Sequence, residues 1–142
     1  MTSVRHTGIV VSDLDAALRF WGHGLRFTED RRSEESGPVI DGVLGLDAVD
    51  VTTVKLVAPG GGMVELLRFR SHLDVAEWQG TPCSTGLPHI ALTVADIDQV
   101  CRRLADLGVE VRPVVASPDG RVRLTYCRGP EGLLVELVEE VG

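Results

Sequence analysis

The stretch Pro88-His89-Ile90-Ala91-Leu92-Thr93-Val94-Ala95-Asp96-Ile97-Asp98 predicts a β-strand that runs directly into a helix. Every second residue from Pro88 to Val94 is apolar, which is the pattern of a strand with one face packed on a core. The intervening positions are small or polar and begin with His89. We therefore expect this second face to line a cavity.

The same pattern occurs once earlier in the chain, from His6 to Asp15. Each histidine precedes one aspartate by seven residues and another by nine: His6 precedes Asp13 and Asp15, and His89 precedes Asp96 and Asp98. This match predicts that the chain is built from two copies of one structural unit.

Both halves predict the order strand–helix–strand–strand–strand. The first half has expected strands at 4–11, 25–31, 51–57 and 63–69, a helix from Ser12 or Asp13 to Gly24, a polar loop over 33–38 and a helical turn over 39–46. The second half has expected strands at 88–94, 109–115, 121–127 and 133–139, and a helix over 96–107. This order predicts an α+β fold in which two βαβββ modules form a curved sheet around a central cleft, with the helices outside. We expect one domain over 1–142, with module 1 at about 4–69, a linker at about 70–86 and module 2 at about 87–139.

Composition narrows the class of protein. The chain has 142 residues, of which 44% are hydrophobic and 25% charged, as is typical of a globular domain. Its net charge of −7 argues against nucleic acid and anionic membranes as partners. No apolar run approaches the roughly 18 residues of a membrane span, and the polar start does not predict a signal peptide. Three cysteines without CxxC spacing favour a reducing, cytoplasmic location over a disulfide framework or a thiolate zinc site.

Two glutamates, Glu65 and Glu136, occupy matching positions in the last apolar strand of each half. A carboxylate in such a strand is unfavourable unless it is solvated, paired or bound to a cation. Taken singly, each histidine and glutamate is most simply a solvated or satisfied side chain, but the duplication places all four at equivalent positions. Together, His6, Glu65, His89 and Glu136 form a donor set that suits one divalent ion of zinc, nickel, cobalt, manganese or iron.

At these residues the chain resembles the vicinal oxygen chelate superfamily, which includes glyoxalase I, methylmalonyl-CoA epimerase, extradiol dioxygenases and bleomycin-resistance proteins. The resemblance covers nearly the whole chain. Its marks are His6, Ser12-Asp13-Leu14-Asp15, Phe20-Trp21, Val64-Glu65-Leu66, Gly86-Leu87-Pro88-His89-Ile90-Ala91, Gly129-Pro130-Glu131-Gly132 and Val135-Glu136-Leu137. The resemblance implies the paired βαβββ fold and metal ligands at His6, Glu65, His89 and Glu136.

The ligand set is most similar to that of glyoxalase I. Bacterial glyoxalase I holds glutathione with an arginine four residues after the first histidine and an asparagine four residues after the first glutamate, where this chain has Val10 and Phe69. The substrate is therefore expected to be a non-glutathione thiol adduct or a thioester. Methylmalonyl-CoA epimerases are similar around Glu34-Glu35-Ser36-Gly37 but have glutamine at the position of Glu65, and their second catalytic carboxylate falls near Ile40 or Asp41, without a clean match.

The resemblance implies a metal-dependent lyase or isomerase that transfers a proton through a metal-bound enediolate of a small-molecule substrate. Glu136 is the first candidate for the catalytic base and Glu65 the second, with Glu34, Glu35 and Asp41 as candidates for an assisting carboxylate.

Two other activities remain open at this point. One is a metal-free protein of the bleomycin-resistance type, which would sequester an antibiotic with help from Trp21 and Trp78. The other is a ring-cleaving dioxygenase, against which the fourth ligand, Glu65, argues, because those enzymes use two histidines and one glutamate. A homodimer is expected, because modules of this superfamily often pair between chains.

Overall fold

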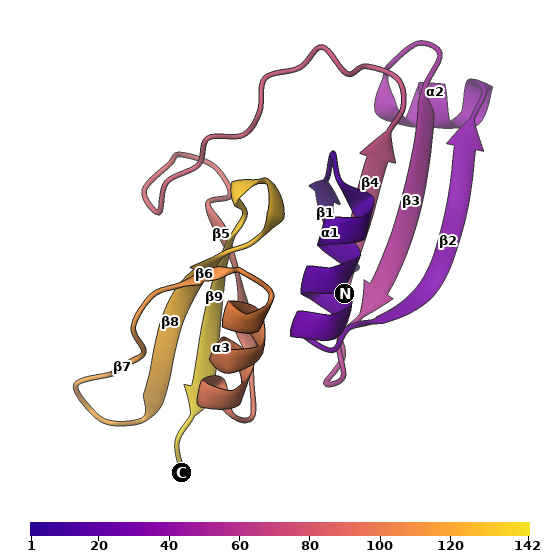
Figure 1. The fold of residues 1–142 in the computed structure, drawn as a ribbon. Coiled ribbons are helices and arrows are strands. Elements are labelled where there is room, and N and C mark those ends of the chain that lie inside the picture. Colours follow the sequence, from indigo (N-terminus) through magenta and orange to yellow (C-terminus); the bar gives the residue numbers. More distant parts are fainter. The chain divides into compact units, whose positions relative to one another are not determined.

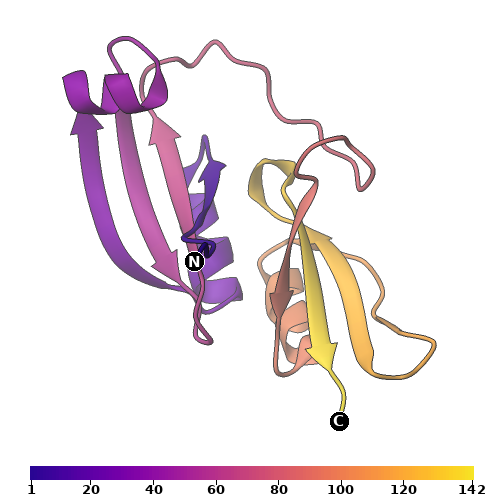
Figure 2. The same cartoon turned by 180° about the vertical axis from the view of Figure 1, so that it is seen from behind.

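The computed structural model describes residues 1–142 and divides into two compact units, residues 1–76 and 77–142. Each unit contains one β-sheet and the helices that pack on it (Figure 1; Figure 2 shows the reverse view). The predicted α+β class and the repeated strand–helix–strand–strand–strand order are confirmed.

Unit 1 forms a four-stranded sheet. Its elements are β1 (Thr7–Val10), α1 (Leu14–Leu18), the π-helical turn η1 (Arg19–Gly24), β2 (Thr28–Ser36), α2 (Pro38–Leu44), β3 (Asp50–Val57) and β4 (Met63–Phe69). The strand order is β1-β4-β3-β2, with β1 parallel to β4 and the other pairs antiparallel. The last strand of the unit therefore lies between the first and the third.

The core of unit 1 contains alternate residues of the two central strands and an aromatic cluster. The strand residues, each at most 2% exposed, are Val54, Leu56, Val64 and Leu66. Trp21 of η1 is 1% exposed and makes edge-to-face contacts with Phe20 and Phe27 at ring-centroid distances of 5.3 and 5.0 Å. Because side chains alternate along a strand, Lys55 and Glu65 lie on the opposite face of the sheet.

Unit 2 repeats this arrangement. Its elements are β5 (His89–Thr93), α3 (Ile97–Asp106), β6 (Glu110–Val111), β7 (Val115–Ala116), β8 (Val122–Arg128), the 3-10 turn η2 (Pro130–Gly132) and β9 (Leu134–Glu140). The strand order is β5-β9-β8-β6, with β7 also paired to β8 and with β5 parallel to β9. Helix α3 buries Ile97, Val100 and Leu104 against the sheet, whereas Cys101 is only partly buried.

The aspartates of the sequence repeat begin the two equivalent helices. The Asp13 carboxylate accepts a hydrogen bond of 3.0 Å from the backbone N–H of Ala16, and Asp96 accepts one of 3.0 Å from Gln99. Both carboxylates therefore satisfy an N–H group that has no partner within the helix. This capping explains why each histidine is followed by an aspartate seven residues later.

Two secondary-structure predictions are wrong. The polar segment 33–38 is not a loop: residues up to Ser36 belong to β2, which pairs with β3 along its length. Backbone pairing at the edge of a sheet needs no apolar side chains, so this strand has no hydrophobic signature. The strand expected over 109–115 is interrupted between β6 and β7, where Pro113 has no N–H to donate to a neighbouring strand.

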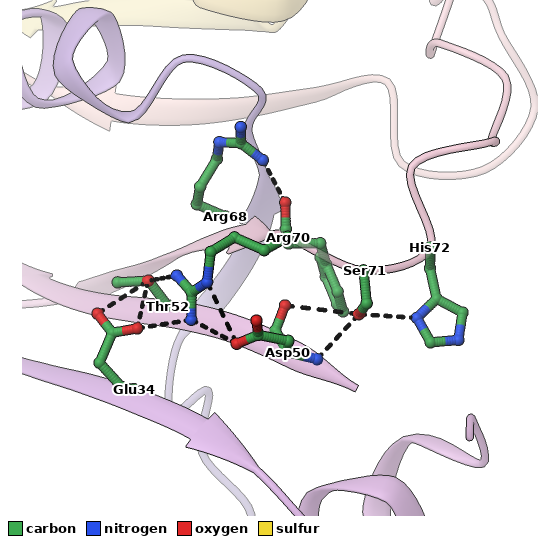
Figure 3. Close-up of polar contacts among 8 residues, drawn as sticks. Glu34, Asp50, Thr52, Arg68, Arg70, Ser71 and His72 are labelled. Atoms are coloured by element: carbon green, nitrogen blue, oxygen red, sulfur yellow. Dashed lines mark hydrogen bonds and ion pairs between the residues drawn. The ribbon is translucent and has the colours of Figure 1, made fainter. Parts of the chain in front are cut away.

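A charged cluster lies where β4 leaves the sheet of unit 1 (Figure 3). The Arg70 guanidinium donates to Asp50 Oδ1 and to Glu34 Oε2 at 2.6 Å each, and also to the Thr52 hydroxyl. The Thr52 hydroxyl in turn donates to the Glu34 carboxylate at 2.9 Å. The hydrogen bond from Arg70 holds the pKa of Asp50 below its usual range. The cluster thus anchors the first residues of the segment that joins the units.

No helix of the structure is long and apolar enough to cross a membrane.

Candidate metal centre

In unit 1, His6 and Glu65 lie side by side at the β1–β4 pair. Gly8 of β1 is opposite Glu65 of β4 in the parallel register, and His6 precedes Gly8 by two residues, which places it on the same face. The His6 Nε2 atom lies 3.7 Å from Glu65 Oε1. The two side chains are 29% and 16% exposed, so both are sheltered but still accessible to a small ligand.

Unit 2 contains the same arrangement. Ala91 of β5 is opposite Glu136 of β9, and His89 precedes Ala91 by two residues. The His89 Nε2 atom lies 3.9 Å from Glu136 Oε1, with the side chains 33% and 17% exposed. The duplication in the sequence therefore produces an equivalent histidine–glutamate pair in each unit.

A tyrosine that the sequence analysis did not identify joins the pair of unit 2. Tyr126 of β8 is opposite Glu136 in the antiparallel register. Its hydroxyl lies 3.3 Å from His89 Nδ1 and 3.5 Å from Glu136 Oε1, and its ring contacts the imidazole edge-to-face. Burial, and then the negative charge of Glu136, raises the pKa of Tyr126. The phenol therefore remains a neutral hydrogen-bond donor near pH 7.

The sheet of unit 1 holds a cavity of about 230 Å³ beside Glu65. Residues of three strands line it: Arg31, Ser33, Glu35, Thr53, Lys55 and Glu65. The lining is polar throughout, with cations, carboxylates and hydroxyls. Lys55 is opposite Glu65 in the β3–β4 register, so it occupies the position that Tyr126 has in unit 2.

The two histidine–glutamate pairs supply donor atoms of the kind that suit a divalent metal ion. Two ligand atoms that each lie about 2.0–2.2 Å from one ion are about 3.0–3.5 Å apart. The separations of 3.7 and 3.9 Å exceed this range and are also longer than a normal hydrogen bond of about 2.7–3.2 Å. The His6 Nδ1 atom is buried and has no hydrogen-bond partner, so the protein alone leaves this imidazole incompletely satisfied. Neither unit by itself gathers three or more histidine, cysteine, aspartate or glutamate side chains into a metal site.

The structure separates the three assisting carboxylates suggested by the sequence. Glu35 lines the cavity together with Glu65. Glu34 instead binds Thr52 and Arg70 in the charged cluster. Asp41 accepts hydrogen bonds from the backbone N–H groups of Val49 and Ala48 at 2.8 and 3.3 Å, which is a structural role. Of the three, Glu35 is the one that the structure places near a proposed ligand.

The tryptophans proposed for stacking on an antibiotic also differ. Trp21 is buried in the core of unit 1, so the expectation that it contacts a ligand is wrong. Trp78 is 45% exposed and lies in the segment that joins the sheets.

Two βαβββ units, each with a histidine at or just before the start of its first strand and a glutamate on its last, are typical of the vicinal oxygen chelate class of α+β proteins. The chain belongs to the glyoxalase/bleomycin resistance protein/dioxygenase superfamily, whose family model matches residues 5–126.

Similar proteins come from several bacteria. The crystal structure of a glyoxalase family protein from Bacillus cereus is 31% identical, with a TM-score of 0.91, over 100% of this chain and 96% of that chain. The uncharacterized protein YwkD of Bacillus subtilis is 29% identical over 143 residues, which is 99% of this chain and 98% of YwkD. The fosfomycin resistance protein FosX of Listeria monocytogenes, solved with Mn(II) and sulfate, has the same fold, with 17% identity, a TM-score of 0.68 and coverage of 99% and 94%. These similarities establish the superfamily and leave the relation to glyoxalase I as a prediction from the ligand set.

Proposed function

We propose that the protein is a metal-dependent lyase or isomerase that moves a proton next to a carbonyl group of a small-molecule substrate. The observation that carries this proposal is the equivalent histidine–glutamate pair in both units, with Nε2–Oε1 distances of 3.7 and 3.9 Å. A binding protein that worked without metal would have no need for this duplicated donor set.

The proposed ligands are His6, Glu65, His89 and Glu136. Two imidazoles and two carboxylates suit zinc, nickel, cobalt, manganese or ferrous iron. Each unit supplies two of these four side chains. When bound, the ion supplies Lewis-acid stabilisation of negative charge that develops on a substrate oxygen.

Glu136 is the proposed general base. Its carboxylate takes the proton from the carbon next to the carbonyl and returns it to the product. The Tyr126 hydroxyl, 3.5 Å from Glu136 Oε1, is placed to hold this carboxylate by a hydrogen bond while it exchanges the proton. Glu65 has no such hydroxyl neighbour; Lys55 occupies the equivalent position, and for this reason Glu65 is the second candidate.

The substrate proposed is a thiol adduct other than that of glutathione, or a thioester. Val10 and Phe69 occupy the positions at which bacterial glyoxalase I holds glutathione, and neither side chain can donate a hydrogen bond or carry charge. Val10 is 59% exposed, so its side chain leaves an apolar surface there.

Elemental analysis of the purified protein, combined with a solvent-deuterium exchange assay, tests the proposal. We expect about one divalent ion for every two histidine–glutamate pairs. We also expect deuterium to be incorporated next to the carbonyl of 2-oxo or thioester substrates. Glu136→Gln should lower the exchange rate by about 10²–10⁴-fold while part of the metal remains bound. Glu140→Gln, an exposed residue at the end of the same strand, is the matched control and should leave the rate unchanged.

Three results would contradict the proposal. Unchanged exchange in Glu136→Gln would remove the assignment of the base. Protein that binds no metal yet sequesters an antibiotic would favour a bleomycin-resistance role. Oxygen uptake with a catechol would favour a dioxygenase.

A further inference from the structure

We infer that the substrate carries an anionic group, a carboxylate or a phosphate, which binds Arg31 and Lys55 in the cavity of unit 1. This inference rests on the proposed function for the position of the reacting oxygens and extends it to the class of substrate.

The two cations lie directly opposite each other. In the antiparallel register of β2 and β3, Arg31 pairs with Lys55, and both side chains line the cavity. Like charges in directly opposed positions destabilise a sheet. An anion bound between them would turn this repulsion into attraction.

Neither cation is neutralised within the protein. The ion pairs of this unit join other residues: Arg32 to Glu29, and Arg70 to Glu34 and Asp50. Glu65 is opposite Lys55 in the sheet, and the polar contact of its carboxylate is with His6 Nε2, at 3.7 Å. Glu35 is opposite Val51, four residue pairs along the strands from the Arg31–Lys55 pair. The charges of Arg31 and Lys55 are thus available to a ligand.

The rest of the cavity lining consists of two hydroxyl side chains and the carboxylates of Glu35 and Glu65. Ser33 and Thr53, opposite each other in the next pair that faces the cavity, supply hydroxyl donors. The chain has a net charge of −7, so its overall field repels anions and an anionic substrate needs local positive charge to bind. A guanidinium and an ammonium, the one planar and the other compact, are side chains that recognise carboxylates and phosphates.

The spacing of the row limits the size of the substrate. Arg31, Lys55 and Glu65 lie on three neighbouring strands in one transverse row. Neighbouring strands are about 4.8 Å apart, so the proposed metal ligand Glu65 lies about 5 Å from the strand of Lys55 and about 10 Å from the strand of Arg31. The anionic group is therefore expected about four to seven bonds from the reacting oxygens.

Calorimetric binding to the full chain tests this inference with two matched pairs of probes. The carboxylate pair is 2-oxoglutarate and its 5-methyl ester, and the phosphate pair is dihydroxyacetone phosphate and dihydroxyacetone. In at least one pair we expect the probe with the free terminal carboxylate or phosphate to bind at least about tenfold more tightly than the analogue in which that group is esterified or absent. The pair that shows the larger preference identifies the anionic group.

The double variant Arg31→Gln/Lys55→Met should lose this preference. The control is Arg32→Gln, which removes one positive charge from the next residue along β2, on the opposite face, and should retain the preference. Thermal unfolding of both variants checks that they fold.

The inference is overturned if wild-type protein does not prefer, or does not bind, either anionic probe, or if the double variant keeps the preference. Metal analysis of the same samples separates this failure from a failure of the proposed function. Bound metal without a preference for the anion would contradict this inference but not the proposed function. A preference for the anion in protein that binds no metal would support the anion site and contradict the proposed metal-dependent function.

Discussion

Replacing Cys127 by alanine should reduce the loss of stability that we expect for the protein at high pH. Cys127 lies on β8 and is 2% exposed, and burial raises the pKa of its thiol from 9.0 to about 12. The folded protein therefore keeps a proton that the unfolded chain releases near pH 9. Because the pKa is raised in the folded state, the stabilising effect is complete below pH 9 and is lost as the pH rises toward 12.

The size of the effect follows from this difference. Between the two pKa values, each pH unit lowers the free energy of unfolding by about 1.4 kcal/mol. From pH 9 to pH 10.5 the loss due to Cys127 is on the order of 2 kcal/mol, which is a large part of the stability of a small domain. Cys127→Ala removes this dependence, although the smaller side chain also lowers stability by an amount that does not vary with pH.

Urea unfolding at pH 7.5, 9.0 and 10.5 in the presence of a reductant would measure the effect. The observable is the difference in free energy of unfolding between wild type and Cys127→Ala, which should shrink as the pH rises. Cys83→Ala is the control, because Cys83 is exposed and its replacement should leave the pH dependence unchanged. Parallel pH profiles for wild type and Cys127→Ala would refute the reasoning.

Two further predictions concern the cores and caps of the units. Trp21→Ala should lower the free energy of unfolding by about 3–5 kcal/mol, because it removes a 1% exposed ring that contacts Phe20 and Phe27. Chemical denaturation measures this loss. A loss below about 1 kcal/mol, as for a surface residue, would contradict the prediction. Asp96→Ala should lower the free energy of unfolding by about 1 kcal/mol, because the first turn of α3 loses the acceptor for Gln99 N–H. The same assay should give a similar loss for Asp13→Ala, at the equivalent helix of unit 1. If neither variant loses stability, the capping role is contradicted.

The sequence was informative wherever one face of an element is buried. The alternation around Ile90 and Leu92 and the helical spacing of Ile97, Val100 and Leu104 predicted β5 and α3 with boundaries close to those observed. Strand β2 was misjudged beyond residue 31 because its residues, TEDRRSEES, are nearly all polar. It pairs only with β3, and its backbone hydrogen bonds leave no trace in the hydrophobic pattern.

The candidate site was predicted in part. Duplication was sufficient to select His6, Glu65, His89 and Glu136, because a repeat marks equivalent positions. Their neighbours depend on strand register, which composition does not reveal.

The sequence nevertheless contained a signal for the residues that lie opposite the two glutamates. Residues at equal distances from a hairpin turn lie opposite each other, so the turn centred on Glu131 pairs Tyr126 with Glu136. The turn at Gly60 pairs Lys55 with Glu65 in the same way. Arg31 could not be found by this route, because a register shift between Glu29 and Arg31 interrupts the β2–β3 pairing.

The order of the strands has a consequence for synthesis on the ribosome. Strand β1, which follows His6, pairs with no strand other than β4, and β5, which begins with His89, pairs with none other than β9. In each unit the histidine is translated first, and its strand has no neighbour to pair with until the glutamate strand, which is the last strand of the unit, has been synthesised. A nascent chain that stalls before Met63 or Leu134 therefore leaves an imidazole on an unpaired segment, and each histidine–glutamate pair is completed only by the final strand of its unit.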